Sequence, residues 1–270
     1  MRRGSIGKFR TGVFQVALAC ACSGILAQEV QFVFTSDAHY GTARKTFRGL
    51  RRVDAQTVNE ALVAGVNALQ GLTLPADGGV GAGQPVGAID FLVEGGDICN
   101  RQEKGAQSAS LSWAQFRTDY IEGLAVKDGD GRKAPLFLIP GNHDADNAAK
   151  DASPMMEIYN RMTASIPPRT AGSFRPAENR IHYSRTFGGT HFVFTSLWPD
   201  RVERSWLEKD LQAITPATPV ILFAHYPPEL PAKRDMPTDD APGEDSQEAL
   251  TRFLKAHPNQ RPFMLCRSGF

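Results

Sequence analysis

The sequence predicts a single α/β domain. Runs of Val, Ile, Leu and Phe with the composition of strands alternate along the chain with segments whose apolar residues recur at helical spacing. Four of the strand-like runs end in polar clusters, and open α/β sheets bind their ligands just beyond the carboxyl ends of strands. The 270 residues suffice for one large buried core, and no repeat or linker divides them.

The expected elements follow one another in a regular order. Residues 30–35 form the first strand, an amphipathic helix covers residues 54–69, and residues 72–87, rich in Gly, Pro and Ala, form a loop. The other expected strands are residues 88–93, 136–139, 180–186, 190–196, 219–224 and 262–265. The other expected helices are residues 110–124, 154–163, 204–213 and 247–256. Gly188 and Gly189 indicate a hairpin between two of these strands. In the helix over residues 110–124, the spacing predicts an apolar side of Leu111, Ala114, Ile121 and Leu124.

The first 27 residues have the order of a secretory signal peptide. A basic segment at residues 1–10 precedes an apolar run at residues 13–21, and small residues continue to Ala27. The apolar run, about ten residues, is too short to span a bilayer as a helix, which takes roughly 20. We therefore expect a signal peptide over residues 1–27, cleaved after Ala27, and export to the periplasm or the medium. The domain then comprises residues 28–270 and has no membrane span. Cleavage after Ala21 or Ser23, and a lipid-modified cysteine at Cys20 or Cys22, are the alternatives.

The composition excludes several classes of protein. With 41% hydrophobic and 22% charged residues, the chain is neither disordered nor fibrous. Beyond the leader, 26 basic residues stand against 29 acidic ones, a balance of −3. This near-neutral body gives no electrostatic basis for a nucleic-acid partner. Cys99 and Cys266, the cysteines beyond the leader, have neither zinc-site spacing nor the number for a disulfide framework.

The polar clusters at the strand ends contain possible metal ligands. The candidates are Asp37, His39, Asp97, Asn142 and His225. Carboxylate, amide oxygen and imidazole together suit Mn, Fe or Zn, whereas calcium prefers oxygen alone. Asp37 and His39 are two residues apart, so along a continuing strand both side chains face the same way. The carboxylate of Asp97 can bridge two cations, and such pairs clamp a phosphate and activate a water.

Two neighbouring residues suggest acid–base chemistry. His143 directly follows the candidate ligand Asn142, and its imidazole can protonate a leaving alkoxide. Asp144 can accept a hydrogen bond from that imidazole and fix its orientation. His143 and Asp144 are therefore the candidate catalytic residues.

Taken in order, these motifs resemble those of the calcineurin-like metallophosphoesterases. The matching residues are Asp37-x-His39, Gly96-Asp97, Gly141-Asn142-His143-Asp144 and His225. The resemblance extends over residues 30–265. It implies a four-layer α/β sandwich, in which two β-sheets are flanked by helices.

The resemblance also implies a role for each site residue. The ligands would be Asp37 and His39 for the first metal ion, Asn142 and His225 for the second, and Asp97 for both. His143 would be the general acid, and Asp144 would orient its imidazole by accepting a hydrogen bond from it. Two divalent or mixed-valence ions (Mn, Fe or Zn) would supply a metal-bound hydroxide. The substrate would be a small phosphate mono- or diester.

One departure from the family pattern affects this expectation. The family normally has a Gly-His-x-His motif after the next strand, but no histidine follows His257 here. Each ion would lack one ligand, and the C-terminal part of the second sheet would be missing. We expect a truncated or frame-shifted product, with an evolved variant as the alternative. Two other functions stay open: an inactive fragment or binding domain of the same fold, and a nuclease with the same metals.

Overall fold

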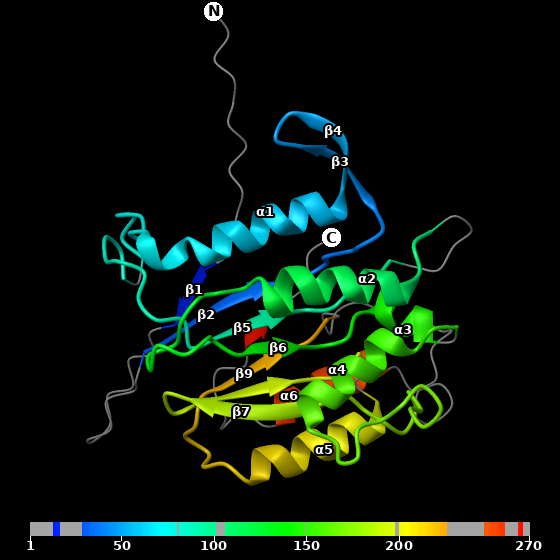
Figure 1. The fold of residues 1–270 in the computed structure, drawn as a ribbon. Helices are drawn as coiled ribbons and strands as arrows, with labels where there is room; N and C mark the ends of the chain where they lie inside the picture. Colours follow the sequence, from blue (N-terminus) through cyan, green and yellow to red (C-terminus); the bar gives the residue numbers. More distant parts are fainter. Residues whose placement is uncertain are drawn as a thin grey trace, which may run out of the picture.

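The computed structural model describes residues 13–16, 29–79, 81–100, 106–148, 150–197, 200–225, 246–256 and 264–266. In these residues two sheets lie face to face, and helices cover their outer sides (Figure 1). The expectation of an α/β fold is confirmed. The predicted signal peptide lies outside the described residues apart from 13–16, and the end of the chain lies outside them beyond residue 266.

The first sheet has the strand order β1-β2-β5-β6. Its strands are β1 (Val13–Val16), β2 (Val30–Thr35), β5 (Phe91–Glu94) and β6 (Leu136–Leu138). Strands β2, β5 and β6 are parallel, whereas β1 pairs antiparallel with β2. The carboxyl ends of the three parallel strands therefore meet at one edge of the sheet.

The second sheet has the strand order β10-β9-β8-β7. Its strands are β7 (Tyr183–Phe187), β8 (Thr190–Phe194), β9 (Val220–Phe223) and β10 (Met264–Cys266). Strands β7 and β8 form the predicted hairpin, and Gly188 and Gly189 adopt the positive φ angles that its turn requires. Strands β8, β9 and β10 are parallel.

Helices cover the outer faces of both sheets (Figure 1). Helices α1 (Ala55–Asn67) and α2 (Ala109–Phe116) lie over the first sheet. Helices α5 (Arg201–Gln212) and α6 (Ser246–Ala256) pack on the second. Helices α3 (Asn142–Ala148) and α4 (Ser153–Thr163) follow β6. Within the described parts of the chain, we find no helix with the length and hydrophobicity to span a bilayer.

Phenylalanines fill the space between the two sheets. The ring of Phe32 on β2 lies 5.9 Å from that of Phe192 on β8 and 5.7 Å from that of Phe223 on β9. The rings of Phe91 and Phe192 are 4.9 Å apart. Because side chains alternate along a strand, Val193 points the other way, toward the aliphatic layer under α5 and α6. The aromatic layer makes both sheets parts of one core.

Each predicted strand and helix has a counterpart, but three features of the structure were not predicted. They are β1, helix α3, and a hairpin of β3 (Ala43–Phe47) and β4 (Leu50–Asp54). Half of the residues in the hairpin's two strands are charged and most are exposed, so they lack the apolar alternation of a half-buried strand.

The predicted apolar side of the helix over residues 110–124 is confirmed in part. Leu124 is buried and Ile121 packs against the core, but Leu111 is 51% exposed and Ala114 is exposed. In the first part of the helix, Trp113, Phe116 and Tyr120 are buried instead. Aromatic side chains bury more area than Leu or Ala, so they determine which side of the helix faces the core. The helix also changes to π-helical geometry over Arg117–Glu122, which breaks the 3.6-residue spacing that the prediction assumed.

The hydroxyl of Tyr183 joins the two sheets, and its removal tests this link. It donates to the carbonyl of Leu138 on β6 (2.8 Å) and accepts from the amide of the same residue (3.0 Å). Tyr183→Phe leaves these buried groups without that partner, so the free energy of unfolding should fall by about 1–3 kcal/mol in denaturant titrations. The control is Tyr159→Phe, on a partly buried ring that packs on Phe174. Equal losses in the two variants would contradict the proposed link.

Candidate metal centre

The candidate site residues lie where four strands end. Asp37 and His39 follow β2, Asp97 follows β5, Asn142 and His143 begin α3 after β6, and His225 follows β9. Because these strands are parallel within their sheets, their carboxyl ends bring distant parts of the chain together. The structure places all the residues predicted from sequence in one region.

The segment of Asp37 and His39 differs from the predicted continuing strand. β2 ends at Thr35, and both residues adopt left-handed backbone conformations, with φ angles of 61° and 47°. The amide of Asp37 donates to the carbonyl of Gly96, and that of His39 to the carbonyl of Asp97, each at 2.9 Å. These bonds hold the strained segment. The two side chains are nevertheless close, as expected: Oδ1 of Asp37 lies 3.5 Å from Nε2 of His39. The turn, and not a continuing strand, brings them together.

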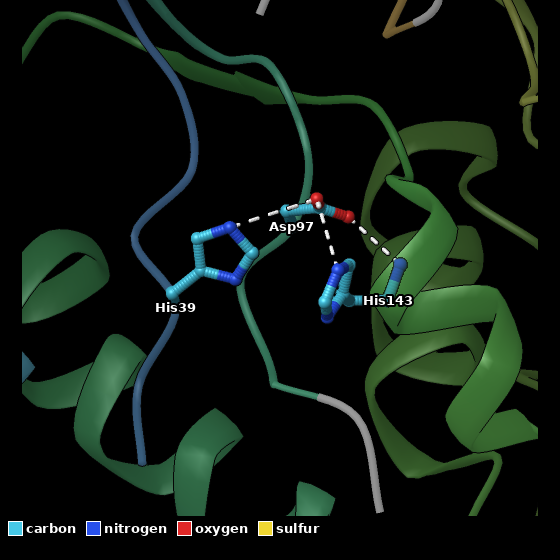
Figure 2. A group of neighbouring side chains, drawn as sticks. All are labelled: His39, Asp97 and His143. Atoms are coloured by element: carbon cyan, nitrogen blue, oxygen red, sulfur yellow. Dashed lines mark hydrogen bonds and ion pairs between the residues drawn. The ribbon is translucent and has the colours of Figure 1, made fainter. Parts of the chain in front are cut away.

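Asp97 is central to the cluster (Figure 2). Its Oδ2 lies 3.4 Å from Nε2 of His225, 3.7 Å from Nε2 of His39 and 4.0 Å from Nε2 of His143. Its Oδ1 accepts a hydrogen bond of 2.8 Å from the amide of His143. Gly141 permits this approach, because a Cβ there would lie 2.2 Å from Oδ1 of Asp97.

The arrangement around His225 suits a cation. Its Nδ1 donates to the carbonyl of Gly95 (2.8 Å), so in the neutral ring the lone pair is on Nε2. That nitrogen faces Oδ1 of Asn142 at 3.2 Å and Oδ2 of Asp97 at 3.4 Å. Three acceptor atoms then converge, and a proton or a metal ion between them would satisfy all three.

The pKa values of the pair reflect this convergence. Burial alone would lower the pKa of His225, but the hydrogen bond and charge of Asp97 raise it above its ordinary value. Burial alone would raise the pKa of Asp97, but His225 and the amide of His143 hold it below its ordinary value. The carboxylate of Asp97 therefore favours a positive charge at His225, in the place that suits a cation.

Asp144 has contacts other than the one predicted for it. Its carboxylate is fully buried and accepts hydrogen bonds from backbone amides of Gly141, Asp97 and Cys99 at 2.9 Å and of Ile98 at 3.3 Å. The predicted bond to the imidazole of His143 is not among them. Asp144 lies in the first turn of α3, which faces the loop after β5. Its carboxylate therefore meets the backbone amides of that loop. Burial and the charge of Asp97 raise the pKa of Asp144 to about 6.

His143 lies beside His39 at the partly exposed side of the cluster. Their rings pack edge to face with centroids 4.8 Å apart, and the side chain of His143 is 20% exposed. Ligand atoms of His39, Asp97 and His143 all lie within 4.8 Å of one another, so this trio could also bind an ion. His143 can thus act as a proton donor, as predicted, or as a ligand.

Sequence reasoning missed Glu94, the last residue of β5. Its side chain is fully buried, and Oε2 accepts a hydrogen bond of 2.6 Å from the hydroxyl of Thr35. Burial raises its pKa well above the ordinary value, and the nearby charges of Asp37, Asp144 and Asp97 add to that effect. A single carboxylate at the end of the apolar run Phe-Leu-Val-Glu, three residues before Asp97, was the signal available in the sequence.

The donor set fits the ions expected from sequence. It combines carboxylate oxygens, imidazole nitrogens and an amide oxygen, which suit Mn, Fe or Zn. Cys99 is not part of it, because its thiol is buried against the carbonyl of Ala109 (3.6 Å) and burial raises its pKa. Cys99 is a small buried apolar residue, as expected.

A family comparison agrees with this geometry. The model of the calcineurin-like phosphoesterase family matches residues 30–258. The chain belongs to this family. Its members are metal-dependent phosphoesterases, so phosphoester substrates are implied for this chain as well. A search of curated proteins finds no match.

Replacing the Asp144 carboxylate tests its role in holding the loops. Asp144→Asn removes the charge and replaces one acceptor oxygen by a donor that faces an amide. We expect the free energy of unfolding to fall by about 1–3 kcal/mol and manganese binding to weaken about 10- to 100-fold by calorimetric titration. The control is Asp90→Asn. Asp90 lies just before β5, away from the cluster, and its carboxylate accepts a hydrogen bond from the amide of Gln31. Unchanged manganese affinity in Asp144→Asn would contradict this role.

The buried Glu94 predicts a pH dependence of stability. The native state retains its proton above the usual pKa of 4.5, whereas the unfolded state releases it. The unfolded state then binds fewer protons, so the free energy of unfolding should fall as the pH rises above that value. Glu94→Gln should remove this contribution in urea titrations between about pH 5 and pH 8. Glu60→Gln, exposed on α1, is the control, and the same pH slope in Glu94→Gln as in the unaltered protein would refute the assignment.

Proposed function

We propose that this chain is an exported, dinuclear-metal phosphoesterase that hydrolyses phosphate mono- or diesters. Family membership supports the phosphoester chemistry. The observation that supports metal dependence is the convergence of imidazole nitrogens and carboxylate oxygens on Asp97. Export is proposed from the order of basic, apolar and small residues in the leader.

We assign the ligands as two sets that share Asp97. Asp37 and His39 would hold one ion, since their ligand atoms are 3.5 Å apart. Asn142 and His225 would hold the other, since theirs are 3.2 Å apart. When bound, two such ions polarise the phosphate and lower the pKa of a water molecule. Mn, Fe and Zn are all compatible with these donors.

The other residues of the site would position groups and move a proton. His143 would protonate the leaving oxygen, because its imidazole is partly exposed beside the cluster and its amide is fixed on Asp97. Asp144 would act through the backbone by holding the loops that bear Asp97 and His143. The four layers of helix, sheet, sheet and helix supply the rigid strand ends that metal geometry requires.

Metal dependence is tested by hydrolysis of p-nitrophenyl phosphate and its bis ester with added manganese. Excess EDTA should abolish turnover, and Asp97→Asn should lower it at least about 100-fold, because it removes a ligand of both ions. Asp77→Asn, in an exposed loop, should have no effect. The preferred ester then identifies the substrate class.

Two outcomes would favour other functions. Manganese binding without turnover of either ester would support a binding domain of the same fold. Cleavage of DNA in preference to both esters would support the nuclease. Turnover that is undiminished in excess EDTA would refute the proposal.

A further inference from the structure

The β3–β4 hairpin is an exposed, strongly basic projection of the molecule (Figure 1). It extends beyond α1, away from both sheets. Between Ala43 and Arg52 the chain has five basic residues and no acidic one. The basic residues are Arg44, Lys45, Arg48, Arg51 and Arg52, and all five are exposed. Within the described residues, no ion pair is formed by any of them.

The charges of the hairpin repel one another in the isolated protein. The register pairs Arg44 with Val53 and Thr46 with Arg51, so the two short strands bring the basic residues of the hairpin close together. Like charges on neighbouring strands repel one another. An external anion would relieve this repulsion, so the hairpin is suited to an anionic partner.

The tip of the hairpin has one exposed apolar side chain among its basic residues. Arg48 and Gly49 form the turn, with φ angles of 49° and 82°, and Leu50 beside them is 64% exposed. Phe47, opposite Leu50, is partly buried, and the guanidinium of Arg48 lies 5.1 Å from its ring centroid. An exposed leucine is thus surrounded by arginines.

The hairpin is fixed to the candidate metal centre. It begins four residues after His39, and the guanidinium of Arg44 donates to the carbonyl of Asp37 at 2.9 Å. The hydroxyl of Thr42 donates to the carbonyl of His39, also at 2.9 Å. A surface bound by the hairpin is therefore held at a set distance from the centre.

We propose that the β3–β4 hairpin binds the surface of an anionic phospholipid membrane. Such a surface presents phosphate headgroups above a hydrocarbon layer, which matches arginines around an exposed leucine. Strands of five residues are about 17 Å long, so the tip is too far from the centre to contact a small substrate there. Nucleic acid fits less well, because single strands bind by stacking on exposed aromatic rings, and Phe47 is partly buried beneath Arg48.

Sedimentation with vesicles tests the proposal on the full chain. The vesicles are phosphatidylcholine alone or phosphatidylcholine with phosphatidylglycerol. We expect binding only when phosphatidylglycerol is present, weakening as salt is added. Each arginine removed should weaken partitioning about fivefold, and the combined Arg48→Gln, Arg51→Gln and Arg52→Gln variant about a hundredfold. Leu50→Ser should also weaken it.

Matched controls separate the hairpin from general charge and apolar effects. Arg132→Gln removes an exposed arginine elsewhere, and Leu111→Ser removes an exposed leucine on α2. Both should bind vesicles as the unaltered protein does. Hydrolysis of soluble p-nitrophenyl phosphate should be the same in all hairpin variants, which distinguishes failure of this proposal from failure of the proposed function.

Four results would overturn the proposal. They are equal binding to both kinds of vesicle, no binding to either, full binding by the triple variant, and unchanged binding by Leu50→Ser. Retardation of DNA by the hairpin at physiological salt, without vesicle binding, would assign the hairpin to nucleic acid instead.

Discussion

The carboxylate of Asp144 holds together the backbone on which the candidate metal centre depends. It accepts amides from the loop after β5 and from the start of α3, which are some 45 residues apart in sequence. Buried amides and a buried carboxylate each lose hydration, and here they satisfy one another. Asp97 and His143 belong to the two segments joined in this way. Their side chains are thereby positioned before any ligand binds.

Close approach of the two segments also depends on glycine. A Cβ at Gly96 would lie 2.5 Å from the amide nitrogen of Gly141, and one at Gly141 would lie 2.1 Å from that of Asp97. Neither position has room for a side chain without moving backbone. The Gly-Asp and Gly-Asn-His-Asp motifs therefore contain packing requirements as well as ligands.

The sequence allowed prediction of the order of elements and the membership of the site, because both depend on local patterns. Apolar runs and strand-end polar clusters were sufficient to place Asp97, Asn142 and His225 together. The sequence did not reveal which groups contact which within the cluster. The partners of Asp144 and the left-handed backbone at Asp37 depend on how neighbouring loops meet. Glu94 and the β3–β4 hairpin were missed for a different reason. Glu94 is a buried carboxylate in an otherwise apolar strand, and the hairpin strands are exposed and lack apolar alternation.

The candidate centre includes residues from both sheets. His225 extends from β9 of the second sheet, and its Nδ1 donates to the carbonyl of Gly95 beyond β5 of the first. Ligands bound only by the native state stabilise it by mass action. An ion shared by His225 and Asp97 would therefore act as a cross-link between the sheets. Metal binding and separation of the sheets are then linked: the more tightly the ion binds, the more free energy is needed to separate the two sheets.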